Sequence, residues 1–123
     1  MKSLFLNPPS YNGFDGAAGS RYQAKREVRS FWYPTWLAQP AALVTGSRLM
    51  DCPPAGIKFD TCIQEAIQYD HVILNTSTPT LQNDCRVAEA IKSGNPKTKI
   101  GFVGAHAAVM PDTTLEASPA IDW

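Results

Sequence analysis

The sequence predicts an α/β protein built on a Rossmann-like parallel sheet with helices on both faces. Four apolar runs alternate with segments of helical spacing along the 123 residues. These runs are apolar throughout and do not alternate with polar residues, which is typical of strands that helices cover on both sides. Strands that alternate with helices favour parallel pairing through crossover connections. We therefore expect the flavodoxin-like strand order 2-1-3-4-5.

The N-terminal part of the chain predicts one strand and two helices. Ser3–Asn7 is an apolar run that stops at two prolines, and it predicts the first strand. Residues 20–30 place basic side chains at every fourth position, so they predict a short helix with one charged face. Residues 35–44 predict a second helix, in which Pro40 either produces a kink or lies near the start.

The middle of the chain predicts two strands and two helices. The stretch SRLMDCPP predicts a short second strand closed by its two prolines. Residues 58–68 predict a helix, because apolar side chains recur there at helical spacing. HVILN predicts the third strand, and the hydroxyl cluster TSTPT follows it. The next helix is predicted to run from Thr80 to about Ser93 and to stop at Gly94.

The C-terminal part begins with TKIGFVG, which predicts the fourth strand. Asp112 or Thr113 is expected to cap a last short helix. The final residues, AIDW, are similar to the start of a fifth strand. We therefore expect an incomplete domain that is truncated at the start of strand 5, with strand 4 as an open edge.

The composition fits one globular domain with no overall electrostatic reason to bind nucleic acid. The chain is 44% hydrophobic and 18% charged, and its formal net charge is zero. The N-terminal apolar run is too short for a signal peptide and no run has the length of a transmembrane helix, so we expect a cytoplasmic protein. Cys52, Cys62 and Cys85 lack the spacing of a metal site and are expected to be free thiols.

The fold class predicts where a ligand would bind. In open parallel sheets, ligands bind outside the carboxyl ends of the strands, near the point where the strand order reverses. In the order 2-1-3-4-5, strands 1, 3 and 4 are neighbours. The loops that follow them should therefore share one edge: Asn7-Pro8-Pro9-Ser10, Asn75–Pro79 and Gly104-Ala105-His106.

Several common ligands fit this edge poorly. A dinucleotide site would need G-x-G-x-x-G after strand 1, where this chain has Pro8-Pro9, and proline lacks the N–H that a phosphate needs. The chain contains no Gly-Lys-Ser/Thr of a phosphate-binding loop. A receiver-type phosphoacceptor would need acidic residues at the ends of strands 1 and 3, and Asn7 and Asn75 stand there instead.

Two polar features of this edge each allow two interpretations. The hydroxyl residues after strand 3 either cap the helix that follows or bind a polar or anionic ligand at its N-terminus. His106 is either a hydrogen-bonded loop residue or a ligand-binding group, and no second metal-binding residue stands at a suitable spacing from it. His71 begins strand 3, at the opposite end of the sheet, and is expected to be structural.

Four stretches together resemble the N-terminal cobalamin-binding domain of B12-dependent radical SAM enzymes. They are LFLNPPS, YPTWLAQPAAL, VILNTSTPT and VGAHAAVMPDTTL. That family typically has N-P-P after strand 1, hydroxyl residues after strand 3 and G-G-x-H-x-T/S-x-x-P after strand 4. Ala105 replaces the second of these glycines. The segment from Gly13 to Leu43 is similar to family members of hopanoid biosynthesis, which form a cyclitol ether head group on bacteriohopanetetrol.

The resemblance implies a cobalamin site at the carboxyl edge of the sheet. Asn7, Pro8, Pro9 and Ser10 would face the corrin ring. Thr76, Ser77 and Thr78 would meet the nucleotide tail, and Gly104 and Ala105 would let the cofactor lie against the backbone. No histidine follows strand 1, so the lower face of the cobalt would carry water, His106 or no ligand.

The resemblance also implies partners outside these residues. Radical SAM chemistry needs a C-x-x-x-C-x-x-C motif for a [4Fe–4S] cluster, and the three cysteines here lack that spacing. S-adenosylmethionine, the cluster and a hopanoid-type lipid substrate would belong to a barrel C-terminal to residue 123, and membrane association would come through that lipid. Residues 1–123 alone would not be catalytic. Two alternatives stay open: a cofactor-free docking domain of the same fold, and an unrelated flavodoxin-like binding module.

Overall fold

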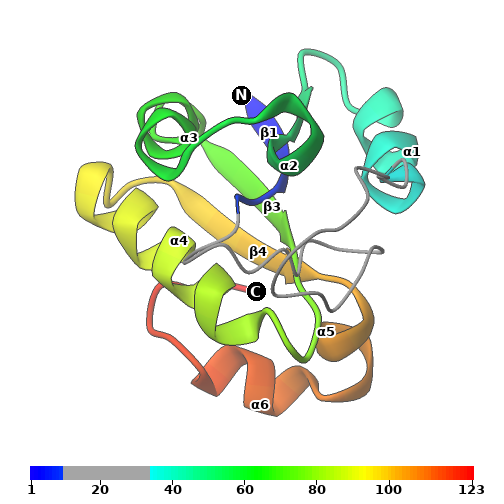
Figure 1. Cartoon of the computed structure of the whole chain (residues 1–123), viewed down its shortest axis with the longest axis vertical. Coiled ribbons are helices and arrows are strands. Elements are labelled where there is room, and N and C mark those ends of the chain that lie inside the picture. The colour runs from blue at the N-terminus through cyan, green and yellow to red at the C-terminus, as the bar shows by residue number, and fades with distance from the viewer. Residues whose placement is uncertain (10–33) are drawn as a thin grey trace.

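The computed structural model describes residues 1–9 and 34–123, which form a four-stranded sheet with helices on both faces (Figure 1). All pairings are parallel and the strand order is β2-β1-β3-β4, which confirms the predicted α/β fold class. The helix predicted over residues 20–30 lies outside the described residues. The strands are β1 (Ser3–Asn7), β2 (Arg48–Asp51), β3 (His71–Asn75) and β4 (Lys99–Val103).

The helices agree with the predicted segments except near two strand ends. Cys52 was expected to end the second strand but begins a one-turn helix, because the prolines after it fit the first turn of a helix, where no N–H partner is needed. A short helix that was not predicted follows β4. The helices are α1 (Thr35–Leu43), α2 (Cys52–Ala55), α3 (Phe59–Ala66), α4 (Leu81–Gly94), α5 (Ala105–Val109) and α6 (Pro111–Glu116).

Pro40 lies inside α1, and Pro111 begins α6. The last helix therefore starts before the residues that were expected to cap it, Asp112 or Thr113. Pro111 suits that first position, since its ring presets a helical φ and its missing N–H has no helical partner to lose. None of the helices in the described residues combines the length and apolar character needed to cross a bilayer.

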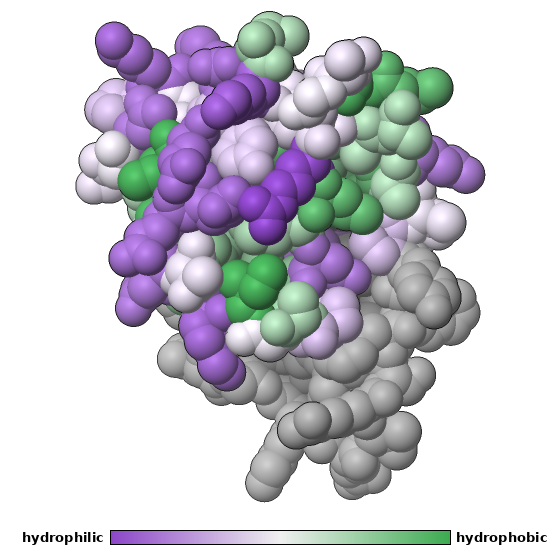
Figure 2. All heavy atoms as spheres, turned by 90° about the horizontal axis from the view of Figure 1, so that it is seen from above, coloured by the Kyte–Doolittle hydropathy of each residue, from purple (hydrophilic) through white to green (hydrophobic). Residues whose placement is uncertain are grey.

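Each face of the sheet has its own apolar layer. Alternate residues of β1, Leu4 and Leu6, point toward α3 and α4, while Phe5 points toward α1 and packs on Leu37. The α1 side of the molecule also presents more hydrophobic surface than the α3 side when seen from above (Figure 2). The larger layer contains, with others, Leu4, Leu6, Val72, Leu74, Ile100, Phe102, Cys62, Ala66, Val87, Ala88 and Ile91.

The last two residues lie along the outer edge of β4, where the fifth strand was expected. They are not a strand, but the Asp122 N–H donates to the Ile100 carbonyl (2.8 Å) and the Phe102 N–H donates to the Trp123 carbonyl (2.9 Å). The Asp122 carboxylate also accepts from Lys92 (2.6 Å) and Lys99 (2.8 Å). Burial alone would raise the pKa of Asp122, but these lysines and the Ile100 N–H hold that pKa well below its usual range.

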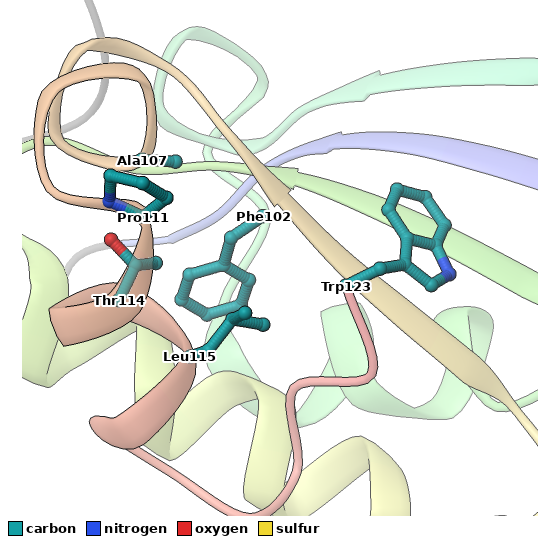
Figure 3. Close-up of a pocket in the computed structure, with 6 residues that line it drawn as sticks. All are labelled: Phe102, Ala107, Pro111, Thr114, Leu115 and Trp123. Atoms are coloured by element: carbon teal, nitrogen blue, oxygen red, sulfur yellow. The ribbon is translucent and has the colours of Figure 1, made fainter.

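The Trp123 ring lies against Gly101, on the face of β4 opposite to Phe102 (Figure 3). A Cβ on Gly101 would come within 1.8 Å of the ring. The absence of a side chain at Gly101 is therefore what allows the indole to cover the end of this face.

We expect Gly101→Ala to displace the Trp123 ring and to lower the free energy of unfolding by about 1–3 kcal/mol, as overpacking does elsewhere. Chemical denaturation measures the loss. In a Trp123→Ala background the same substitution should cost almost nothing, because the clash is gone. An equal cost in both backgrounds would contradict this account of Gly101.

Candidate functional site

The three loops predicted to share an edge do meet at the carboxyl ends of the strands. The Thr76 N–H donates to the Val103 carbonyl (2.8 Å), which joins the loop after β3 to the end of β4. A hydrogen bond between Thr78 Oγ1 and His106 Nδ1 (2.9 Å) joins the same two segments at a greater distance from the strands. Asn83 Nδ2, in the first turn of α4, donates to the Pro9 carbonyl (3.2 Å) and so connects the loop after β1.

The backbone conformation and a close contact within the chain require glycine at position 104. Its φ is +119°, in a region that residues with a side chain rarely adopt. A Cβ there would lie 2.2 Å from the Thr76 carbonyl oxygen and 2.9 Å from Asn75 Oδ1. The close approach that this glycine permits is thus made by the neighbouring loop. Approach of a ligand to Gly104 remains a prediction, whereas Ala105, the first residue of α5, is exposed.

Two of the three predicted hydroxyl residues are bound inside the protein. Thr76 Oγ1 donates to Asp84 Oδ2 (2.8 Å), and the Ser77 N–H donates to Thr80 Oγ1 (3.0 Å). Thr80 stands at the N-cap of α4, but its side chain makes no capping bond, so the capping interpretation is wrong there. The hydroxyl groups of Thr76 and Thr80 stabilise the loop instead. Thr78 is exposed, although its hydroxyl group is already hydrogen-bonded to His106 Nδ1.

His106 is a buried residue of α5 whose ring has one nitrogen without a hydrogen-bond partner among the described residues. Its side chain is 6% exposed, and its Nδ1 atom is hydrogen-bonded to Thr78. Its Nε2 atom is buried and has no hydrogen-bond partner among the described residues. The Nδ1 atom of His106 therefore agrees with the interpretation as a hydrogen-bonded residue. Its Nε2 atom is available for a ligand.

Asn7 and Asp51 pair at the ends of β1 and β2. They are neighbours in the parallel register, and Asn7 Nδ2 donates to Asp51 Oδ1 at 2.6 Å. Burial raises the pKa of Asp51, and the hydrogen bond from Asn7 partly opposes that rise. Asn7 Oδ1 is buried and has no partner among the described residues. Pro8 and Pro9 are also buried, and Ser10 lies outside the described residues.

Asp84 has the most strongly shifted pKa among the acidic residues of this edge. It is 1% exposed, and burial raises its pKa to about 7 even though hydrogen bonds from Thr80, Thr76 and Asn83 lower it. Neither Asp84 nor Asp51 forms an ion pair with another described residue. A carboxyl group with such a pKa exchanges its proton near neutral pH, so this edge can change charge there.

Asp51, Asn83 and Asp84 were not among the predicted site residues. Asp51 could have been found from the rule that placed the other loops, because it ends a strand of the same parallel sheet. Asn83 and Asp84 stand in the first turn of the helix after the hydroxyl cluster, and only the bonds to Pro9 and Thr76 reveal their place. No three metal-binding side chains gather anywhere in residues 1–9 and 34–123.

A small apolar cavity of about 110 Å³ lies beside β4 (Figure 3). Phe102 and Leu115 point toward one another across it. The hydroxyl group of Thr114 is already used, since it donates to the Met110 carbonyl (2.7 Å). The cavity contains none of the predicted site residues; its lining is Phe102, Ala107, Pro111, Thr114, Leu115 and Trp123.

Gly104→Ala should destabilise the protein whether or not a ligand binds. The added Cβ meets the Thr76 carbonyl, and the positive φ adds strain of about 1–3 kcal/mol. Chemical denaturation of the ligand-free protein measures the loss. An Ala105→Gly variant, at the exposed neighbouring position, is the control and should unfold within about 1 kcal/mol of the parent. Parental stability of Gly104→Ala would contradict the contact.

Asp84→Asn should flatten the pH dependence of stability. The pKa of Asp84 rises from 3.8 to about 7 on folding, so the folded state holds the proton more tightly. Its contribution to stability is fully present below about pH 4 and is lost as the pH rises through 7, by at most about 1.4 kcal/mol per pH unit.

The free energy of unfolding should be measured from pH 4.5 to 8 for the parent, Asp84→Asn and the exposed control Asp112→Asn. We expect only Asp84→Asn to reduce the slope. An unchanged slope would show that Asp84 does not titrate in this range.

Comparison with known proteins adds no assignment to this site. No protein-family model, no curated protein and no solved structure matches the chain. Any function of the carboxyl edge is therefore a proposal that rests on its own residues.

Proposed function

We propose that the chain is the cobalamin-binding module of a B12-dependent radical SAM enzyme that acts in hopanoid biosynthesis in the cytoplasm. The radical chemistry of such an enzyme, with its S-adenosylmethionine and [4Fe–4S] cluster, would take place in a barrel C-terminal to residue 123. In this proposal the described residues bind and orient the cofactor and perform no catalytic step.

The main support for a ligand at this edge is the position of buried polar atoms that have no hydrogen-bond partner in the described part of the chain. Four buried side-chain nitrogen or oxygen atoms lack a partner among the described residues, and three of them belong to Asn7, Asn83 and His106. Asn7 ends β1, Asn83 lies in the first turn of α4 after β3, and His106 lies in α5 after β4. Hydrogen bonds connect Asn83 to Pro9 and His106 to Thr78. An unmade hydrogen bond on a buried group costs roughly 1–3 kcal/mol, which a polar ligand would recover.

These residues suit the polar rim of a corrinoid. Asn7 and Asn83 offer amide oxygens and His106 offers a ring nitrogen for hydrogen bonding, and the exposed Thr78 and Ala105 stand at the ends of the two loops nearest β4. Bound cobalamin would supply a redox-active cobalt centre. The hydrogen bond between Thr78 and His106 Nδ1 holds the ring with Nε2 buried, so we propose that His106 holds the two loops together and does not ligate the metal.

The first alternative, a cofactor-free docking domain, is favoured by one observation. Thr76, Ser77 and Gly104, which the resemblance assigns to the cofactor, are already engaged with other parts of the chain. The second alternative, a flavodoxin-like module for a phosphate-bearing ligand, is disfavoured because Pro8 and Pro9 provide no N–H groups after β1.

Titration with hydroxocobalamin, followed by desalting and a visible spectrum, tests the proposal. We expect the protein to retain the corrinoid. Thr78→Leu should weaken retention by about tenfold, because it removes one hydroxyl at the site and places a larger apolar side chain there. Ser93→Leu is the matched control: it also replaces an exposed hydroxyl, in the last turn of α4 at the far edge of the sheet.

A colourless protein with the circular dichroism of a folded α/β domain would overturn the cobalamin proposal and favour the docking domain. Equal losses in Thr78→Leu and Ser93→Leu would place the corrinoid elsewhere on the molecule.

A further inference from the structure

Two side-chain amides of the carboxyl edge are held by their nitrogen atoms. Asn7 Nδ2 donates to Asp51 at 2.6 Å, and Asn83 Nδ2 donates to the Pro9 carbonyl at 3.2 Å. The Pro9 carbonyl only accepts hydrogen bonds, and the Asp51 carboxylate does so when it is ionised, which fixes which end of each amide is nitrogen. Each oxygen atom therefore points away from its anchored partner, and both oxygens are buried without a donor among the described residues.

The described residues next to Asn7 in the chain offer few donors. Asn7 is followed by two prolines, which have no N–H to give, and their carbonyl groups add further acceptors. The nearest acids, Asp51 and Asp84, bond to Asn7 and Asn83 respectively. A group that only accepts hydrogen bonds, such as a phosphate, would meet further acceptors at these described groups.

We infer that the part of the edge formed by Asn7, Pro8, Pro9 and Asn83 selects a ligand by the N–H or O–H groups that the ligand donates, and that it rejects phosphate. The inference rests on the proposed cobalamin function and adds a specific contact. The primary amides on the rim of the corrin meet Asn7 and Asn83, and the phosphate of the nucleotide tail stays away from them. Asn7 and Asn83 thereby discriminate an amide from a carboxylate at the same position.

Three corrinoids separate these contributions in a spectrophotometric titration at pH 8. Hydroxocobalamin carries the amides and the nucleotide tail, cobinamide carries the amides alone, and cobyrinic acid carries carboxylates in their place. We expect cobinamide to bind within about threefold of hydroxocobalamin, and cobyrinic acid to bind at least about tenfold more weakly than cobinamide. The difference should shrink in Asn83→Leu.

Gln82→Leu provides the matched control, because it makes the same amide-to-leucine change at an exposed neighbour on the first turn of α4. Asn83→Leu should weaken cobinamide binding by about tenfold, and Gln82→Leu should leave it unchanged. Circular dichroism and a denaturation midpoint show whether each variant is folded.

The outcomes distinguish this inference from the function on which it rests. Tight binding of cobyrinic acid, or binding of hydroxocobalamin with loss of cobinamide, would overturn selection by amide donors and leave the cobalamin function standing. Parental binding by a folded Asn83→Leu variant would do the same. Failure of all three corrinoids to bind would overturn both.

Discussion

The approach of Gly104 to the Thr76 carbonyl is the contact on which the carboxyl edge depends. It lets the chain leave β4 and turn across the end of β3, where the Thr76 N–H meets the Val103 carbonyl. That turn places His106 beside Thr78. It also holds Thr76 in place to bond the buried Asp84 of α4. A single position without a side chain thus sets the relative placement of two loops and one helix.

The edge contains two kinds of polar group, and they differ in whether the chain already satisfies them. The hydroxyl groups of Thr76 and Thr80 and the backbone of Ser77 are bonded within the loop, so they give the edge its shape. The amide oxygens of Asn7 and Asn83 are buried without a described donor, and keeping them so costs free energy. Shape and recognition would therefore come from different residues, whereas the resemblance assigns Thr76 and Ser77 to the cofactor.

The sequence predicted the sheet well, because the pattern of each strand is local. Ser3–Asn7 is a nearly continuous apolar run that two prolines end, and this local pattern is enough to predict a strand. The five-residue helix α5 was missed since Ala105–Val109 contains neither a capping side chain nor an amphipathic repeat. The residues of the site were harder to predict from the sequence. The burial of Asp84 depends on how α4 seats against β3, and the anchoring of Asn83 depends on Pro9, which is 74 positions away in the chain.

The C-terminal residues change what the outer side of β4 offers to other molecules. An unpaired parallel strand is a template on which another chain can add a strand and begin to aggregate. Here the Ile100 carbonyl and the Phe102 N–H are taken by Asp122 and Trp123, and two lysines hold Asp122 in place. High salt weakens such exposed ion pairs, so the resistance of this edge to intermolecular β-sheet growth should depend on ionic strength.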